Sequence, residues 1–527
     1  MLAAVIAGGA PNFVSGIAGA LGDGGGATTV KIIAHWLTIR RRSAAAFCAL
    51  LTVALAATAC GEPQVPVARS SSAELVTATS EPAPPTPTPL PAPTAEPTPG
   101  SGEPVPTPRR IAQPGLSNDV IRVAVIFDDE TQGTADELFR DGWLGTLAWA
   151  NEVNDDGGLG GRFVEVVPID SLLFDHQSAL EQVCQGDFFA IVGSHSLGDA
   201  EGAELLGTEQ CNIADFPGQV YGSRRAASPV TVLSNPFLND IRQAGPASYL
   251  AETFPKASQN LGLLRYFALD LERANERQRE MLIGQGLDVV FELPAELEED
   301  PAERIVSRWE ASGAESLVWV ADPGRLISLL DALEEPPSFV LCEWGCYSQQ
   351  FLLDGGEAVE GVYTWIAHSH FDSPNARGDL FQYRANLATV APDAGWSEIG
   401  LQSWMAGRLF EEAFNRLLQV EPELPTREQL IQIARGIDLY AANGILSATN
   451  PGGGEPTPCF VLMVVRNGRW EQEYPEPPRD QDCAEKNLHE LVTSRSLGIT
   501  TLSATTSDAQ PTPEAEPDLE NPEELEE

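Results

Sequence analysis

Lysine is scarce in this sequence. It occurs three times, as Lys31, Lys256 and Lys486, and the 32 Lys and Arg residues face 76 Asp and Glu residues, for a formal net charge of -44. A strongly acidic protein repels phosphates, so nucleic acid is excluded as a partner. None of the three lysines follows a suitable glycine, so the sequence also lacks a phosphate-binding loop for nucleotides.

Motifs typical of enzymes and metal sites are also missing. The stretch GSHSLG at 193–198 has the wrong spacing for a G-x-S-x-G nucleophile elbow. Carboxylates are so numerous that no acid–base pair stands out. His368 and His370 would share one face of a strand and could bind a metal, but such a pair more often marks an exposed strand end. We therefore expect no enzyme, no cofactor and no metal.

The apolar run at 44–57 is too short for a comfortable membrane span. It follows three arginines at 40–42 and has the length of a signal-peptide apolar region. It ends at Cys60 in the sequence Ala-Thr-Ala-Cys, which resembles a bacterial lipobox with alanine in place of the usual leucine. An ordinary signal peptide or an uncleaved anchor is the alternative. We expect 1–59 to be an upstream extension and signal peptide, and Cys60 to carry a lipid anchor on a bacterial membrane.

Two segments have compositions that cannot form a hydrophobic core. Residues 60–118 are rich in Pro and Thr, which predicts an extended, polyproline-like linker between the anchor and the folded part. Residues 480–527 are polar and become strongly acidic from 513 onward, which predicts a largely disordered tail.

The globular part opens with a strand, a helix and a second strand. Residues 120–127 read VIRVAVIF and predict a buried strand, and 162–170 predict another. Glycine pairs within 151–162 can adopt the positive φ that ends the intervening helix. This β-α-β order indicates a parallel α/β sheet. The expected apolar face of the helix consists of Phe139, Trp143, Leu147, Ala150 and Val153.

Strands and helices continue to alternate through the rest of the globular part. A helix is expected at 177–185, a strand at 187–193, and a further helix from residue 200 within the segment 200–218. The alternation restarts near residue 246, which implies a second lobe built like the first. Its expected strands are 261–269, 287–293, 315–321 and 338–344, and its expected helices are 247–254, 272–285, 302–312 and 324–333.

This order resembles the type I periplasmic-binding-protein family, in the branch that binds branched-chain amino acids. The residues that match the opening unit of that branch are Asn154, Gly157, Gly158, Gly160, Gly161 and Asp170. Residues 356–371, the long helix at 397–418 and a hairpin at 459–472 with an Asn-Gly turn resemble its later elements. The resemblance implies an α/β fold of two doubly wound parallel-sheet lobes joined by a three-strand hinge.

The resemblance also implies domain boundaries. Lobe 1 would comprise 119–245 and 368–455. Lobe 2 would comprise 246–367 and a closing hairpin at 456–479. The hinge would consist of crossings near 244–246, 363–368 and 447–460.

A ligand cleft is expected where the parallel strands end. Ligands of such sheets bind beyond the carboxyl ends of the strands, and two facing lobes enclose them. In lobe 1 the loops at these ends carry Asp128, Asp129 and Glu130, and then Ser194, His195 and Ser196.

The resemblance assigns roles to some of these loop residues. A hydroxyl, best matched by Ser196 and next by Ser194, would hold the carboxylate of an amino acid, and Glu343 would hold its ammonium group. Asp322, Trp344 and Tyr347 would line the same wall. Each of these residues could instead be a solvated loop residue. The family's Ala-Thr and Tyr-Gly pairs are replaced by the residues at 214–218 and 268–273, so the ligand need not be a standard α-amino acid.

Six cysteines lie in the globular part and its continuation. An even number in an exported protein favours disulfides, and six allow fifteen pairings. Pairs of sequence neighbours are the simplest: Cys184–Cys211, Cys342–Cys346 and Cys459–Cys483. A zinc site at the closely spaced middle pair is the competing interpretation, but it lacks a second Cys/His pair nearby.

These observations favour a binding protein. The expected function is an extracytoplasmic, lipid-anchored protein that captures a small polar molecule, an amino acid or a related compound, and delivers it to the permease of an ABC importer. Ligand binding would shift a hinge equilibrium between open and closed lobes. A sensing or scaffold lipoprotein of the same fold, without a transport role, is the alternative.

Overall fold

The computed structural model describes residues 113–129, 139–173, 175–236, 241–266, 272–295, 302–373 and 378–491. The expected signal peptide, Cys60, most of the linker, Glu130 and the acidic tail after 491 lie outside these residues. Among the described residues, no helix is long and apolar enough to cross a membrane.

The first sheet has four parallel strands in the order β2-β1-β3-β4. These are β1 (Val120–Phe127), β2 (Phe163–Asp170), β3 (Ala190–Val192) and β4 (Ala214–Phe216). Helix α2 (Arg140–Asp155) joins β1 to β2, and glycines 157, 158, 160 and 161 after it all have positive φ. The predicted opening unit is therefore confirmed.

Helices cover both faces of this sheet. Along β1, Ile121 and Val123 pack on the side of α2 and α11 (Glu398–Val420), whereas Ala124 and Ile126 pack on the side of α3 (His176–Gln185). Side chains alternate between the two faces because a strand has a period of two residues. Both faces are buried, so the strand is a nearly continuous apolar run.

The predicted apolar face of α2 is only partly correct. Phe139, Ala150 and Val153 are buried as predicted, but Trp143 and Leu147 are only half-buried. Other residues of the helix are buried in the core instead, among them Leu144, Ala148 and Trp149. The reason is that α11 packs on α2 as closely as the sheet does, so the helix is buried on two sides. A Cβ atom at Gly145 would lie 2.0 Å from the carbonyl oxygen of Gly400.

The second sheet has seven strands in the order β12-β11-β10-β9-β8-β6-β7. Strands β6 to β10 are parallel, and β11 and β12 form an antiparallel hairpin beside them. The hairpin turn is Asn467-Gly468, and both residues have positive φ, as a tight Asn-Gly turn requires. The strands are β6 (Leu261–Tyr266), β7 (Val289–Ala295), β8 (Ser316–Val320), β9 (Val340–Cys342), β10 (Val362–Ile366), β11 (Val461–Arg466) and β12 (Arg469–Tyr474).

Helices also cover both faces of the second sheet, which confirms the predicted doubly wound architecture. Core residues of α5 and α6 pack on one face and those of α7, α8 and α9 on the other. The cluster on the α7–α9 face is continuous with the α2–α11 core of the first sheet. The helices are α5 (Gly245–Thr253), α6 (Glu272–Gly284), α7 (Ala302–Ser312), α8 (Pro323–Ala332) and α9 (Gln349–Gly355). We call each sheet with its helices a lobe.

The remaining helices within the described ranges are α4 (Ser223–Ala226), α10 (Gly378–Val390) and α12 (Arg427–Arg435). The described 3-10 turns are Ala203–Leu205, Ala257–Gln259, Gly356–Val359, Ala442–Gly444 and Glu485–Asn487. The prediction of a helix from residue 200 is wrong, because only the 3-10 turn at Ala203–Leu205 forms there. Gly202 and Gly207 on either side adopt left-handed conformations, which interrupt a helix.

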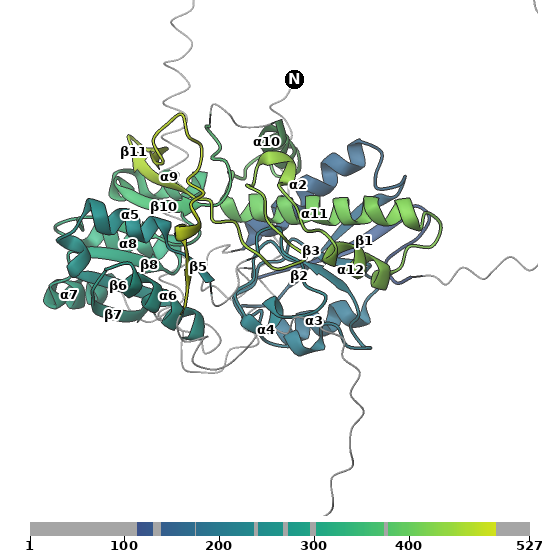
Figure 1. The fold of residues 1–527 in the computed structure, drawn as a ribbon, viewed down its shortest axis with the longest axis horizontal. Coiled ribbons are helices and arrows are strands. Elements are labelled where there is room, and N and C mark those ends of the chain that lie inside the picture. The colour runs from purple at the N-terminus through teal and green to yellow at the C-terminus, as the bar shows by residue number, and fades with distance from the viewer. Residues whose placement is uncertain are drawn as a thin grey trace, which may run out of the picture. The chain divides into compact units, whose positions relative to one another are not determined.

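A small two-stranded sheet lies between the two larger ones in Figure 1. In it β5 (Ile241–Gln243) pairs antiparallel with β13 (Leu488–Glu490). The prediction that the tail begins at residue 480 is therefore wrong for 480–491, which belong to the folded part. Composition did not reveal this strand because its pairing partner lies more than two hundred residues away.

The part of the chain that the structure describes contains three disulfides, and they join the predicted pairs. Cys184–Cys211 links α3 to the segment before β4, and Cys342–Cys346 closes the loop after β9. Cys459–Cys483 ties the segment before β11 to the segment before β13. The last bridge explains why residues beyond 480 remain attached to the fold.

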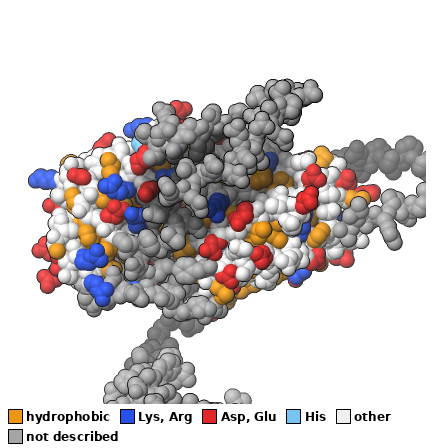
Figure 2. All heavy atoms as spheres, turned by 90° about the horizontal axis from the view of Figure 1, so that it is seen from below, with side chains coloured by type: hydrophobic (Ala, Val, Ile, Leu, Met, Phe, Trp, Pro, Cys, Tyr) orange, Lys and Arg blue, Asp and Glu red, His pale blue; other side chains and the backbone are white. Residues whose placement is uncertain are grey.

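Acidic side chains do not gather at one place on the face that Figure 2 shows. They are scattered there among basic and apolar side chains of the described residues. The large negative charge is thus carried, on this face, as a mixed and solvated surface.

Candidate functional site

The first predicted loop residue, Asp128, is buried beneath the end of β1. It is 2% exposed and accepts hydrogen bonds from the hydroxyls of Ser171 and Ser196, the latter at 3.0 Å, and from the backbone N–H of Leu197 at 2.8 Å. Burial raises the pKa of Asp128, and these donors oppose that rise. The structure thus brings Asp128 and Ser196 together, but as partners of each other.

The other two residues of the predicted second loop are also buried. Ser194 accepts a hydrogen bond from the N–H of Ile126 at 3.0 Å. His195 stacks on Phe139 with ring centroids 5.9 Å apart, and neither ring nitrogen has a hydrogen-bond partner among the described residues. Burial, assisted by Arg225, lowers the pKa of His195 to about 3. The imidazole is therefore neutral at ordinary pH.

Glu343 follows β9, as predicted, and already has partners in lobe 2. Its carboxylate accepts a hydrogen bond from Trp365 Nε1 at 2.8 Å, and Arg242 contributes a favourable charge. Burial nevertheless raises the pKa of Glu343, because desolvation is the largest effect on it.

An aromatic triad of Phe139, Tyr221 and Trp344 connects the two lobes. Trp344, in the loop after β9, lies 5.1 Å from Phe139 and 5.6 Å from Tyr221 between ring centroids. Its Nε1 donates a hydrogen bond to the Tyr221 hydroxyl at 2.8 Å. Aromatic pairs at such distances contribute about 0.5–1.5 kcal/mol beyond the burial of their area. Phe139 and Tyr221 were not predicted as site residues.

A buried ion-pair network holds Tyr221 in place. Arg225 makes a bidentate pair with Asp215, with distances of 2.8 and 2.9 Å, and both side chains are almost completely buried. Asp199, 4.0 Å from the same guanidinium, accepts the backbone N–H of Tyr221 at 2.9 Å. Asp215 belongs to the segment 214–218 that departs from the family pattern, so this departure supplies the network.

The remaining predicted residues have structural partners as well. Asp322 caps α8 by accepting the N–H of Arg325 at 2.8 Å. Tyr347 is 1% exposed, and its hydroxyl accepts the N–H of Phe371 at 3.1 Å. The backbone N–H of Asp129 donates to Asp170 at 3.2 Å.

A groove of about 1270 Å³ lies beside the aromatic triad. Lobe 1 contributes the start of α2, including the half-buried Trp143 and Leu147, and the segment before α11. Lobe 2 contributes the start of α8 and the loop after β9. Two predicted residues, Asp322 and Trp344, line it. Its charged lining residues are Arg140, Asp141, Asp322, Arg325, Asp354 and Asp393. The groove therefore offers an apolar wall with polar groups of both signs.

His368 and His370 are not at an exposed strand end, so that prediction is wrong. They are 2% and 8% exposed, and His368 forms a bridge with Leu446 beyond the end of β10. His368 Nδ1 lies 2.9 Å from the carbonyl oxygen of Ser369. Within the described ranges, no group of three or more His, Cys, Asp or Glu side chains could hold a metal ion.

Comparison with known proteins adds independent findings. Residues 120–469 match the model of a protein family described as periplasmic binding protein. No curated protein matches the chain.

Several solved structures are similar. A fatty acid ABC transporter substrate-binding protein from Thermomonospora curvata has a TM-score of 0.59 and 18% identity, over 72% of this chain and 97% of that one. A leucine binding protein from Thermotoga maritima has a TM-score of 0.54 and 14% identity, over 68% and 99%. A solute binding protein from R. palustris in complex with 4-hydroxybenzoate has a TM-score of 0.55 and 16% identity, over 69% and 98%. At these identities the likeness establishes the fold, which agrees with the prediction.

Proposed function

Because the chain belongs to the periplasmic binding protein family, we propose that it is an extracytoplasmic solute-binding protein that delivers its ligand to an ABC importer. The observation that supports the proposal is the groove between the lobes. Beside it, Trp344 of one lobe donates a hydrogen bond to Tyr221 of the other. A ligand that contacts both walls stabilises the arrangement in which the walls face each other. Binding, and no catalysis, is the proposed activity.

The ligand class follows from the lining of the groove. Trp143, Leu147 and Trp344 offer an apolar wall, and charged side chains of both signs lie at its margin. We propose a small molecule with an apolar body and at least one charged group, which includes amino acids and simple carboxylic acids. Of the similar structures named above, one is a fatty acid ABC transporter substrate-binding protein, one is a leucine binding protein, and one is a solute binding protein in complex with 4-hydroxybenzoate.

Ser196 and Glu343 remain proposed ligand contacts, on the condition that a ligand replaces the hydrogen bonds they make within the protein. The Ser196 hydroxyl donates to Asp128 and the Glu343 carboxylate accepts from Trp365. A ligand would have to replace these bonds, which costs about 0.5–1.5 kcal/mol for each neutral bond and more for a charged one. Asp322 and Trp344 line the groove directly and are the better candidates for first contact.

Thermal unfolding against a panel of amino acids, aromatic carboxylates and fatty acids tests the proposal. A ligand at a hundred times its Kd stabilises the protein by about 2.7 kcal/mol. Trp344→Ala should abolish the rise in melting temperature that the ligand causes, because the substitution removes an aromatic side chain that lines the groove and contacts both lobes. Phe381→Ala is the matched control, because Phe381 is 62% exposed on α10 and does not line the groove. A shift that survives in Trp344→Ala places the ligand elsewhere.

The transport role and the lipid anchor need their own tests. If the protein serves an importer, deleting its gene should abolish cellular uptake of the compound that stabilises it, and the intact gene should restore uptake. Metabolic labelling with a radioactive fatty acid should mark the wild-type chain and leave Cys60→Ser unlabelled. Labelling of both chains, or of neither, contradicts the anchor at this cysteine.

A scaffold or sensing role without transport is the second candidate. The observation that favours it is that Ser196, Asp128 and Glu343 all have internal partners. A protein that is folded, gives no shift with any member of the panel and leaves uptake unchanged when deleted would support this candidate over the first.

A further inference from the structure

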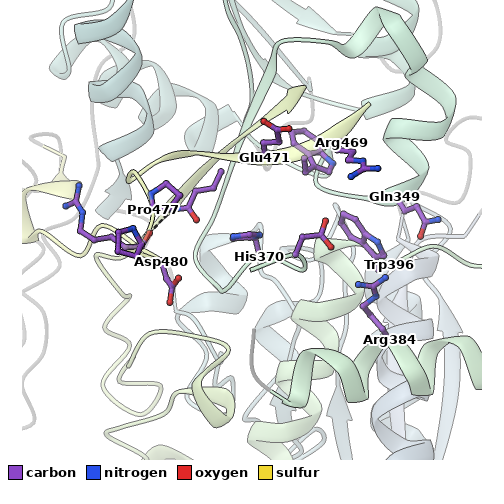
Figure 3. A pocket seen from close by; sticks show the side chains of 13 residues that line it. Gln349, His370, Arg384, Trp396, Arg469, Glu471, Pro477 and Asp480 are labelled. Carbon is purple, nitrogen blue, oxygen red and sulfur yellow. Dashed lines mark hydrogen bonds between the residues drawn. The ribbon is translucent and has the colours of Figure 1, made fainter. Parts of the chain in front are cut away.

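A second pocket lies outside the groove, beside the closing hairpin. Its volume is about 830 Å³. Figure 3 shows its side chains converging from β12, from the segment after it, from α10 and from the loop after β10. The polar groups that line it are Gln349, His370, Asp372, Arg384, Arg469, Glu471, Gln472, Arg479 and Asp480, and the apolar ones are Trp396, Trp470, Pro477 and Pro478.

Three arginines line this pocket, and none of them has an ion-pair partner among the described residues. Arg479 lies over the ring of Tyr474, 5.9 Å from its centroid, which leaves Arg384 and Arg469 for a ligand. Arg384 belongs to α10 and Arg469 to β12, and neither lies within 4.0 Å of a described carboxylate. By contrast Arg466, three residues earlier in the same hairpin, pairs with Glu473. Both side chains are exposed, so a ligand in the pocket can reach them. Arginine presents a planar fork that binds carboxylates and phosphates through two hydrogen bonds.

The two arginines flank an aromatic surface. In Figure 3, Arg469 and Arg384 come from opposite sides of Trp396, whose indole faces the same space. Trp396 is held by Phe371 and Tyr347, with ring centroids 4.3 and 5.2 Å away. The indole is therefore fixed in position before any ligand arrives, which lowers the entropic cost of binding.

Other groups restrict what the pocket can accept. His370 is 8% exposed, and its Nδ1 has no hydrogen-bond partner among the described residues. Asp372, Glu471 and Asp480 also line the pocket and would repel a second anionic group. One negative group beside the arginines and an apolar body against Trp396 satisfy both conditions.

We propose that this pocket is a second ligand site, for a small organic anion whose carboxylate or phosphate is held between Arg384 and Arg469 and whose apolar body lies on Trp396. Trp396 also lines the groove between the lobes. An anion here therefore touches a wall that the two cavities share. The site does not depend on the proposed function of the groove.

Arginine-specific modification with phenylglyoxal, read out peptide by peptide by mass spectrometry on the full chain, tests the proposal. Benzoate or phenyl phosphate should slow the modification of Arg384 and Arg469 together, about tenfold at saturation and with one midpoint below ~10 mM. The neutral analogue benzamide should protect neither. Arg308 is the matched control, because it is exposed on α7 and lines neither cavity.

The outcomes separate the possible sources of protection. Benzoate and phenyl phosphate distinguish a carboxylate site from a phosphate site. Equal protection by inorganic phosphate, or by benzamide, would overturn the organic-anion assignment. Unchanged modification rates, or equal slowing at Arg308, would overturn the site altogether. Protection of Arg140 and Arg325 reports binding in the groove separately.

A variant provides the second measurement. Arg384→Gln should weaken the protection of Arg469 by benzoate about tenfold or more, because a hydrogen bond to a charged group is lost. The same protection in Arg384→Gln and in the wild-type chain would mean that the two arginines do not share a ligand, contrary to the proposal.

Discussion

The buried imidazole of His195 makes a specific prediction about stability and pH. The ring is inaccessible to solvent, and its nitrogens make no hydrogen bonds within the described residues. Burial lowers its pKa from 6.5 to about 3. The folded state therefore resists protonation, whereas the unfolded chain binds a proton below pH 6.5. The contribution to stability is complete above the unfolded pKa and is lost as the pH falls from 6.5 toward 3.

The size of the loss follows from linkage. Between about pH 7.5 and about pH 5, one such histidine lowers the free energy of unfolding by roughly 2 kcal/mol. His195→Phe keeps an aromatic ring on Phe139 and removes the titrating group. The glycines 142 and 218 leave little spare room around the ring, so the variant should lose about 1–3 kcal/mol at pH 7.5 through overpacking. Between pH 7.5 and pH 5, however, the free energy of unfolding of His195→Phe should fall by roughly 2 kcal/mol less than that of the wild type.

Urea unfolding at both pH values, followed by tryptophan fluorescence, measures the difference. Ser403→Ala is the control, because it disturbs packing beside the same ring and removes the hydrogen bond to the Gly193 carbonyl without removing a titrating group. Its pH dependence should equal that of the wild type. If the free energy of unfolding of His195→Phe also changes with pH in parallel with that of the wild type, then His195 does not take up a proton on unfolding, contrary to the prediction. Comparing variants is necessary because buried carboxylates such as Asp199, whose pKa burial raises to about 7, act with the opposite sign.

Three further predictions concern stability. Arg225→Met should lower the free energy of unfolding by about 3–5 kcal/mol in urea unfolding, because Asp215 stays buried without its partner. A decrease of less than about 1 kcal/mol would contradict this prediction. Gly145→Ala should lower the free energy of unfolding by about 1–3 kcal/mol, because its Cβ would overlap the Gly400 carbonyl. An unchanged melting temperature would contradict the close packing of α2 on α11. Cys184→Ser should cost about 3–4 kcal/mol by opening a disulfide with a sequence separation of 27, and a reducing agent should then have a smaller effect on the variant than on the wild type.

Sequence patterns were sufficient wherever the information is local. The strand β1 and the turn at Asn467-Gly468 were predicted because apolar runs and positive-φ residues act over a few positions. The disulfides were predicted because each joins sequence neighbours among the six cysteines. The resemblance to periplasmic binding proteins rested on the same ordered elements, and the family match confirms it.

Only the tertiary structure decided which polar groups have partners. Tyr221 and Trp344 are 123 positions apart and share a hydrogen bond, so no local pattern could reveal it. Ser196 was predicted to be available to a ligand, yet it bonds to Asp128, 68 positions away. A strand end predicts where a loop lies, but burial and long-range contacts determine whether its side chains face solvent, a ligand or each other. For the same reason the unpaired Arg384 and Arg469, brought together from α10 and β12, emerged only from the folded chain.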